Sequence, residues 1–241
     1  MSCLSTSLNP HESPPTLLTG NHFIDVELGG FPIGGITHIY GPAGVGKSTL
    51  AMEAFLHLAR KGSGCFIIDC AHSYNPRRLL QLAAAPSFPA HRLTLFYPRT
   101  FKEQTELITK LHLFLDPTIR LIVIDPITGL YRQRITPQTA ITFYRELAEH
   151  QLPRLLGLAR DHKLAILIIN QISTWQGEDQ PVGGDAIHRY AIMEIQLQRR
   201  KEGESTHRWM VIRRRKHPNV QRLLVQLNTV GFQALRVAEK R

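Results

Sequence analysis

The sequence lacks the features of membrane-spanning and exported proteins. No apolar run reaches the roughly 18 residues that a membrane-spanning helix needs, and the first residues lack the basic start and apolar stretch of a secretory signal. Cysteines are few: Cys3, Cys65 and Cys70 are odd in number and have no metal-like pairing. We therefore expect free thiols in a cytosolic protein that is neither exported nor bound to a membrane.

Acidic residues are scarce beside basic ones, with 19 Asp and Glu against 29 Lys and Arg and a formal net charge of +10. Such a surplus favours acidic partners, above all nucleic acid, and solvated surface charge is the alternative. Two basic clusters, at residues 199–201 and 213–217, lie close together in the second half of the chain. Their placement favours the nucleic-acid interpretation.

The chain also lacks internal repeats, long linkers and low-complexity tracts. Its 241 residues, 43% of them apolar and 20% charged, are enough for one domain with a large core. Residues 1–18 are rich in Ser, Pro and Thr, which predicts a flexible N-terminal arm. Residues 19–241 are expected to form one compact domain.

Strand-like and helix-like segments alternate along most of this domain. Strands are predicted at 36–40, 65–69, 92–97, 120–125 and 164–171, and helices at 47–60, from Pro76 onward, at 101–115 and at 137–162 with a kink at Pro153. After Ile187 the pattern is all strand. The order predicts an α/β fold with a mostly parallel twisted sheet flanked by helices and antiparallel strands at its C-terminal edge.

The segment GPAGVGKST fits the phosphate-binding P-loop pattern and lies between an apolar strand and a helix. Glycines let successive backbone N–H groups point at anionic oxygens, and the following helix adds its positive end. Lysine reaches the β- and γ-phosphates of ATP, and the serine hydroxyl binds Mg²⁺. The predicted nucleotide residues are Gly41, Pro42, Ala43, Gly44, Val45, Gly46, Lys47, Ser48 and Thr49.

Two further strand ends complete the predicted site. Asp125 ends the buried run RLIVID and would anchor Mg²⁺ together with Ser48; the alternative is a turn aspartate before Pro126. Gln171 follows the strand LAILIIN and would hydrogen-bond the γ-phosphate; the alternative is a bond to local backbone. ATP and Mg²⁺ are therefore the expected cofactors.

These motifs resemble the RecA/RadA recombinases from about Thr19 to Phe232. The matching stretches are TGNHFIDVELGGFPIGGITHIYGPAGVGKST, RLIVIDPITGLYR, LAILIINQI and PVGGDAIHRYA. The short chain and RKHPN are most similar to the archaeal RadB proteins of that superfamily, and KaiC-like ATPases are the nearest confusable group. The resemblance implies a RecA-like P-loop ATPase core.

The resemblance further implies an ATP- and DNA-binding accessory protein of homologous recombination and repair. Its expected partners are single-stranded or branched DNA and a RadA-like recombinase or Holliday-junction nuclease, with a homo-oligomer possible. Arg78 corresponds to the arginine that stacks on adenine in that family; a surface helix arginine is the alternative. The competing functions are an active DNA-dependent ATPase and a KaiC-like signalling ATPase that does not bind DNA.

Three departures from the recombinases bear on mechanism. Their catalytic glutamate falls here on Ala71, whose methyl group cannot accept a proton, so weak or absent hydrolysis is expected. His72 or an acid of another subunit could substitute, and the catalytic residue stays unassigned. The loop 172–182 is shorter than the strand-exchange loop and contains Glu178 and Asp179, which implies little strand exchange. The N-terminal arm contains no Phe, which argues against long filaments.

The DNA contacts predicted from the resemblance lie in two regions. Arg132 and Arg134 follow Tyr131 in the segment that matches the first DNA loop. Tyr131 would either stack on a base or pack under that loop. Trp175, in the second loop, would either stack on a partner or cover the base of the loop.

The second predicted region is the run Arg213, Arg214 and Arg215. Strand alternation places Arg213 and Arg215 on one side and Arg214 on the other. Three interpretations stay open: contact with DNA phosphates, solvated charge, or an ATP cap. In the ATP cap, Lys216 or His217 covers the nucleotide of a neighbouring subunit.

Overall fold

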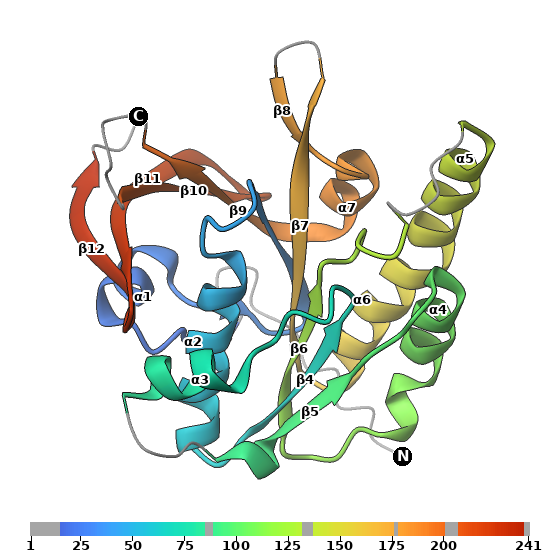
Figure 1. The fold of residues 1–241 in the computed structure, drawn as a ribbon, viewed down its shortest axis with the longest axis horizontal. Helices are drawn as coiled ribbons and strands as arrows, with labels where there is room; N and C mark the ends of the chain where they lie inside the picture. Colours follow the sequence, from blue (N-terminus) through green and yellow to red (C-terminus); the bar gives the residue numbers. More distant parts are fainter. Residues whose placement is uncertain (1–14, 85–88, 132–136, 176–177, 201–206, 239–241) are drawn as a thin grey trace, which may run out of the picture.

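The computed structural model describes residues 15–84, 89–131, 137–175, 178–200 and 207–238. Within these residues, parallel strands lie side by side in the order β5, β4, β6, β7, β3, β9 (Figure 1). Their bounds are Gly35–Gly41 for β3, Gly64–Asp69 for β4, Leu93–Phe96 for β5, Ile119–Asp125 for β6, Ala165–Trp175 for β7 and Ala191–Arg199 for β9. The apolar runs of β3, β4, β6 and β7 are buried almost throughout, as expected for strands covered on both faces.

Antiparallel strands extend the sheet beyond β9. They are β10 (His207–Arg214), β11 (His217–Asn228) and β12 (Gly231–Ala238), each paired with the strand before it. The predicted architecture is therefore confirmed, including the antiparallel extension at the C-terminal edge. Because β10 runs antiparallel to β9, the end of β9 at Arg199 and the turn after β10 lie at opposite ends of the strands. The basic residues at 199–200 and at 213–217 are therefore far apart in the fold.

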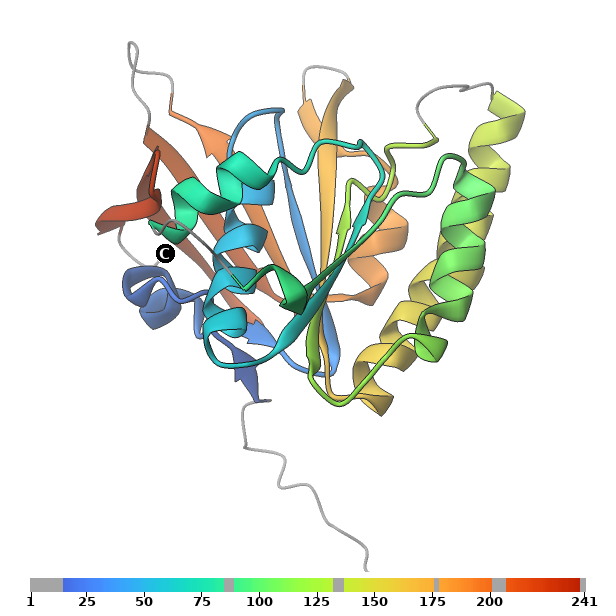
Figure 2. The same ribbon diagram turned by 60° about the horizontal axis from the view of Figure 1, so that its bottom comes forward.

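Helices cover both faces of the sheet (Figures 1 and 2). The helices α1 (His22–Leu28), α2 (Lys47–Arg60) and α3 (Pro76–Ala83) contribute to one buried apolar cluster. A second cluster, on the other face, includes residues of α4 (Phe101–Lys110), α5 (Pro137–Arg145), α6 (Leu152–Asp161) and α7 (Gly184–Tyr190). The strands lie between these two clusters, so both faces of the sheet are packed. Short 3₁₀ helices span Ala90–Arg92 and Leu111–Leu113.

The predicted N-terminal arm includes a segment that the structure places in the fold. Strand β1 (Thr16–Leu17) pairs with β2 (Phe31–Pro32), and Leu17 packs in the apolar cluster of α1 and α2. The packed part of the chain therefore begins before residue 19, inside the range assigned to the arm.

The long helix predicted at 137–162 consists of α5, a π-helical segment at Glu146–Gln151, and α6. Pro153 lies in the first turn of α6, where a missing backbone N–H is tolerated. The π-helical segment directly precedes the proline, which is the kind of local irregularity at which helices bend, and the kink at Pro153 stays a prediction.

Of the segment 172–182, predicted as a loop, residues 172–175 and 178–181 form a two-stranded β-ribbon. Strand β7 continues past Gln171 to Trp175, and the chain returns as β8 (Glu178–Pro181), with Ile172 opposite Pro181. Figure 1 shows this ribbon projecting from the carboxyl edge of the sheet. Among the described residues, no helix is both long and apolar enough to span a membrane.

Candidate functional site

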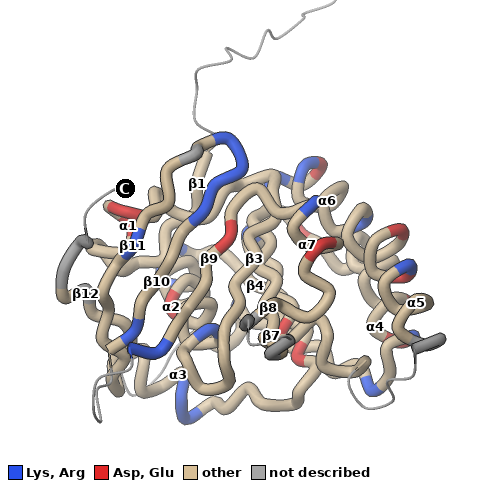
Figure 3. Tube along the Cα trace, turned by 90° about the horizontal axis from the view of Figure 1, so that it is seen from above, with Lys and Arg blue, Asp and Glu red and all other residues tan. Residues whose placement is uncertain are grey.

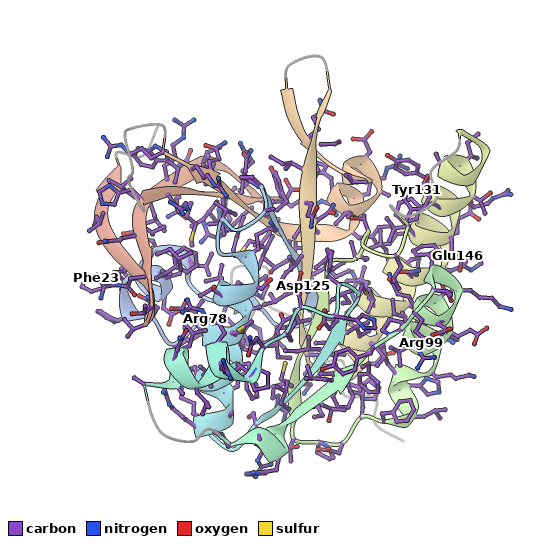
Figure 4. The ribbon with its side chains drawn as sticks, viewed as in Figure 1. Phe23, Arg78, Arg99, Asp125, Tyr131 and Glu146 are labelled. Atoms are coloured by element: carbon purple, nitrogen blue, oxygen red, sulfur yellow. The ribbon has the colours of Figure 1, made fainter. Side chains whose placement is uncertain are left out.

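The predicted nucleotide residues come together at the carboxyl edge of the parallel strands. Gly41 at the end of β3 lies beside Gln171 of β7, and Asp69 of β4 lies beside Asp125 of β6. Figure 4 shows Asp125 near the middle of the molecule, at the end of β6. The crevice outside the carboxyl ends of such strands is where ligands bind in open α/β sheets.

The loop between Gly41 and Lys47 connects β3 to α2 and takes its shape from its glycines. Gly44 and Gly46 have φ angles of 69° and 109°, in the left-handed region that favours glycine. A Cβ atom at Gly41 would lie 2.2 Å from the carbonyl oxygen of Leu197 on β9. The loop therefore curls closely against β9 and leads into the positive end of α2, the geometry that binds phosphate groups.

The ammonium group of Lys47 is held inside this loop. The residue is 7% exposed, and its Nζ donates to the carbonyl oxygens of Gly41 at 2.9 Å and Pro42 at 2.7 Å. A buried cation that bonds neutral carbonyls is stabilised further by an anion placed between it and the helix end. The position of Lys47 therefore fits the predicted contact with ATP phosphates.

Ser48 and Asp125, the two predicted Mg²⁺ ligands, are in direct contact. Ser48 Oγ donates to Asp125 Oδ2 at 2.5 Å. Burial of Asp125 raises the pKa of its carboxyl group to about 6, against the lowering effect of the hydrogen bond from Ser48. The described residues contain no group of three or more His, Cys, Asp or Glu that could hold a metal. One hydroxyl and one carboxylate fit Mg²⁺, which takes its other ligands from water and phosphate oxygens.

The turn after β4 contains Ala71, the residue that the resemblance matches to the catalytic glutamate of the recombinases. Asp69 is buried, and its carboxylate accepts hydrogen bonds from the backbone N–H groups of Ala71 at 3.2 Å, Ser73 at 3.1 Å and Tyr74 at 3.0 Å. These bonds fix the turn and leave Ala71 exposed. His72 lies next in the chain, with Nε2 3.3 Å from the carbonyl oxygen of Pro98.

Gln171 lies beside the phosphate loop, and its neighbour Asn170 joins two loops that the sequence analysis treated separately. The fully buried Asn170 side chain accepts a hydrogen bond from Thr128 Oγ1 at 2.8 Å and donates one to the carbonyl oxygen of Val182 at 2.6 Å. Thr128 follows β6, and Val182 follows β8. Asn170 was not among the predicted site residues, although an amide that ends the apolar run LAILII is a visible signal in the sequence.

Arg78 lies on α3 against the turn between β11 and β12 (Figure 4). Its guanidinium donates to the carbonyl oxygens of Thr229 at 2.7 Å and Asn228 at 3.1 Å. Glu53 of α2 stabilises the same turn, because its carboxylate accepts a hydrogen bond from the backbone N–H of Phe232 at 2.8 Å. This contact was not predicted from the sequence. The adenine-stacking role of Arg78 stays a prediction.

Of the predicted first DNA loop, Arg132 and Arg134 lie outside the described residues. Tyr131 is described, and its ring stacks on Phe143 with centroids 3.7 Å apart and an interplanar angle of 18°. The tyrosine therefore packs against α5, in agreement with the second of its two interpretations. The side chain of Trp175 also lies outside the described residues.

The three arginines at the end of β10 have separate partners. Arg214 donates to the carbonyl oxygens of Glu27 at 3.1 Å and Leu28 at 2.6 Å, so it caps the C-terminal end of α1. Arg213 bonds Tyr40 and Gln196, each at 3.2 Å.

Arg215 donates to the carbonyl oxygens of His188 and Arg189 at the end of α7, away from α1. The basic run forms a continuous blue segment at the β10–β11 turn in Figure 3. Because β10 runs antiparallel to β9, this turn lies at the sheet edge opposite the phosphate loop. An ATP cap made by Lys216 or His217 therefore requires a second copy of the chain.

The twisted parallel sheet, the curled loop leading into α2, and the contact between Ser48 and Asp125 define a RecA-like P-loop domain. Comparison with known proteins agrees: the model of the RecA N-terminal domain matches residues 8–239. The chain therefore belongs to the RecA family, and within it is RadB-like.

Two sequence relatives are each named "DNA repair and recombination protein RadB". The protein of Thermococcus kodakarensis is 36% identical over 161 residues, which cover 65% of this chain and 70% of the relative. The protein of Methanococcus maripaludis strain C7 is 32% identical over 166 residues, or 68% of this chain and 76% of the relative. A crystal structure described as the RadB recombinase has a TM-score of 0.77 at 28% identity and covers 92% of this chain and 100% of that chain.

Proposed function

We propose that this chain is an ATP- and DNA-binding accessory protein of homologous recombination and DNA repair that hydrolyses ATP weakly or not at all. One observation carries the proposal: Lys47 lies inside the loop and Ser48 is bonded to Asp125, while Ala71, two residues after the strand end beside Asp125, has only a methyl group. The names of the RadB relatives support the role in recombination and repair.

ATP would be held by the backbone N–H groups of residues 43–49 and by the Lys47 ammonium. Ser48 and Asp125 would hold Mg²⁺, which supplies charge neutralisation for the phosphates. Gln171, beside Gly41 and next to the start of the β7–β8 ribbon, would hydrogen-bond the terminal phosphate, and the ribbon would then shift when ATP binds. The absence of a carboxylate at Ala71 leaves an attacking water without its usual base. ATP then acts mainly as a conformational ligand.

DNA binding is supported by the net charge of +10 and by the arrangement of the two loops. Asn170 ties the segment after β6 to the segment after β8, so both move with the strand that carries Gln171. Single-stranded or branched DNA is the proposed ligand, bound through phosphate contacts that depend on salt. A RadA-like recombinase or a junction nuclease is the proposed protein partner, and Lys216 or His217 would act between copies of the chain if they form an ATP cap.

Three measurements on the full chain test this function. Calorimetry with ATP and Mg²⁺ is expected to show binding, and no heat at millimolar ligand would refute the nucleotide site. Steady-state turnover with and without single-stranded DNA is expected to stay well below roughly one per second; faster turnover would identify an active ATPase. DNA affinity is expected to fall steeply with salt, and absent or salt-independent binding would favour a signalling ATPase that does not bind DNA.

A further inference from the structure

Arg199 is the last residue of β9 and extends over the phosphate loop. β9 runs parallel to β3 with Gln196 opposite Tyr40, so Arg199 reaches past the strand end at Gly41. Its Nη2 donates to the carbonyl oxygen of Ala43 at 2.7 Å. A Cβ atom at Gly44 would lie 3.4 Å from the same nitrogen. The guanidinium group therefore touches the tip of the loop, from the side opposite β6 and β7.

The positive charge of Arg199 has no carboxylate partner in the described part of the chain. The salt bridges found there join other residues, and the hydrogen bond to Ala43 reaches only a neutral carbonyl. Arg208 lies opposite Arg199 on β10, and burial together with the charge of Arg199 lowers the pKa of Arg208. Within the described residues, Arg199 therefore brings a positive charge to the loop tip without a carboxylate beside it, and an anion bound there would be stabilised.

Lys47 and Arg199 contact successive carbonyls of the loop. Lys47 bonds the carbonyl oxygens of Gly41 and Pro42, and Arg199 bonds that of Ala43. The lysine of a P-loop reaches the β- and γ-phosphates, while the amides at the start of the helix surround the inner phosphates. The tip at Ala43 therefore faces the outer end of the triphosphate. Since guanidinium carries five N–H donors, Arg199 retains donors for phosphate oxygens after bonding Ala43.

We propose that Arg199 binds the terminal phosphate of ATP from within the same chain, so that one copy of the protein distinguishes ATP from ADP without a neighbouring subunit. This inference rests on the proposed function, because it requires a nucleotide in the loop. With Ala71 in place of a catalytic acid, Arg199 recognises the terminal phosphate and does not activate water. The bound ATP then persists as a signal.

The test compares the affinities of the full chain for ADP and for the β,γ-imido analogue of ATP, each with Mg²⁺, by calorimetry. Arg199→Ala is expected to weaken binding of the ATP analogue about tenfold and to leave ADP binding nearly unchanged. Arg199→Lys keeps the charge but loses the planar guanidinium group. Its affinity for the ATP analogue is expected to lie between those of the wild type and Arg199→Ala. Arg222→Ala is the matched control, since Arg222 is an exposed arginine of β11 and its loss changes the net charge equally.

The outcomes separate this inference from the proposed function. Wild-type protein that binds neither nucleotide contradicts the proposed function itself. Wild-type protein that binds both, with an unchanged ratio of affinities in Arg199→Ala, contradicts the inference alone. An equal loss for both nucleotides also contradicts it, because Arg199 would then only support the loop through Ala43. Unfolding midpoints of all variants by circular dichroism show that the proteins compared are folded.

Discussion

Glu53 offers a test of how the phosphate-loop helix is joined to the C-terminal strands. Its carboxylate lies between α2 and the β11–β12 turn, where Oε1 accepts the N–H of Phe232. Oε2 is buried, and within the described residues it has no hydrogen-bond partner. Burial raises the pKa of this carboxyl group from 4.5 to about 7. We predict that Glu53→Gln stabilises the protein above pH 7.

The sign follows from the direction of the shift. The folded protein holds the proton of Glu53 more tightly than the unfolded chain, so stability falls as the pH rises from 4.5 through about 7. A difference of about 2.5 pKa units, 7 minus 4.5, corresponds to about 3 kcal/mol lost above pH 7. Glutamine stays neutral and retains an oxygen for Phe232, but burying its NH₂ group costs about 1–2 kcal/mol. The net gain at pH 8 is therefore about 1–2 kcal/mol.

Urea unfolding at pH 5 and pH 8 measures this effect. The stability difference between variant and wild type is expected to change by about 2.5 kcal/mol between the two pH values, because part of the loss has already occurred at pH 5, and the variant is the more stable at pH 8. Glu106→Gln is the control, because the Glu106 side chain is 54% exposed. If the Glu53→Gln difference were the same at both pH values, the carboxyl group would not titrate as its burial requires.

Three further changes address function directly. Lys47→Ala removes the ammonium group from the loop and is expected to weaken ATP binding at least about 100-fold while the protein stays folded; calorimetry and circular dichroism measure the two effects. Ala71→Glu restores an acid beside the phosphate site and is expected to raise ATP turnover about tenfold or more, whereas unchanged turnover would mean that another catalytic element is missing. Arg215→Ala is expected to reduce the slope of DNA affinity against salt concentration by about one ion; an unchanged slope would remove Arg215 from the DNA contacts.

The sequence predicts the sheet, its flanking helices and the phosphate loop because these depend on local patterns. Buried runs such as Arg120–Asp125 identify parallel strands, and the spacing of Gly41, Gly46 and Lys47 identifies the loop. The conformation of 172–182 was harder to predict, because its short polar sequence gives little sign of strand pairing.

Contacts between distant parts of the chain escaped prediction. Arg199 and Ala43 are separated by 156 positions, and Glu53 and Phe232 by 179. No local pattern joins such residues; only the order of strands in the sheet brings them together. The run of three arginines is another example. Strand alternation predicts which side of the sheet each arginine lies on, but it does not predict that Arg214 bonds the carbonyl groups at the end of α1.

The side chain of Asn170 imposes a mechanical constraint. Its single amide group fixes Thr128 on one side and Val182 on the other, at distances that allow little stretch. If Thr128 shifts by an ångström or so, either Val182 follows or a hydrogen bond inside the protein breaks without water to replace it. A ligand that displaces one of the two loops therefore either displaces the other as well or loses the free energy of a buried hydrogen bond.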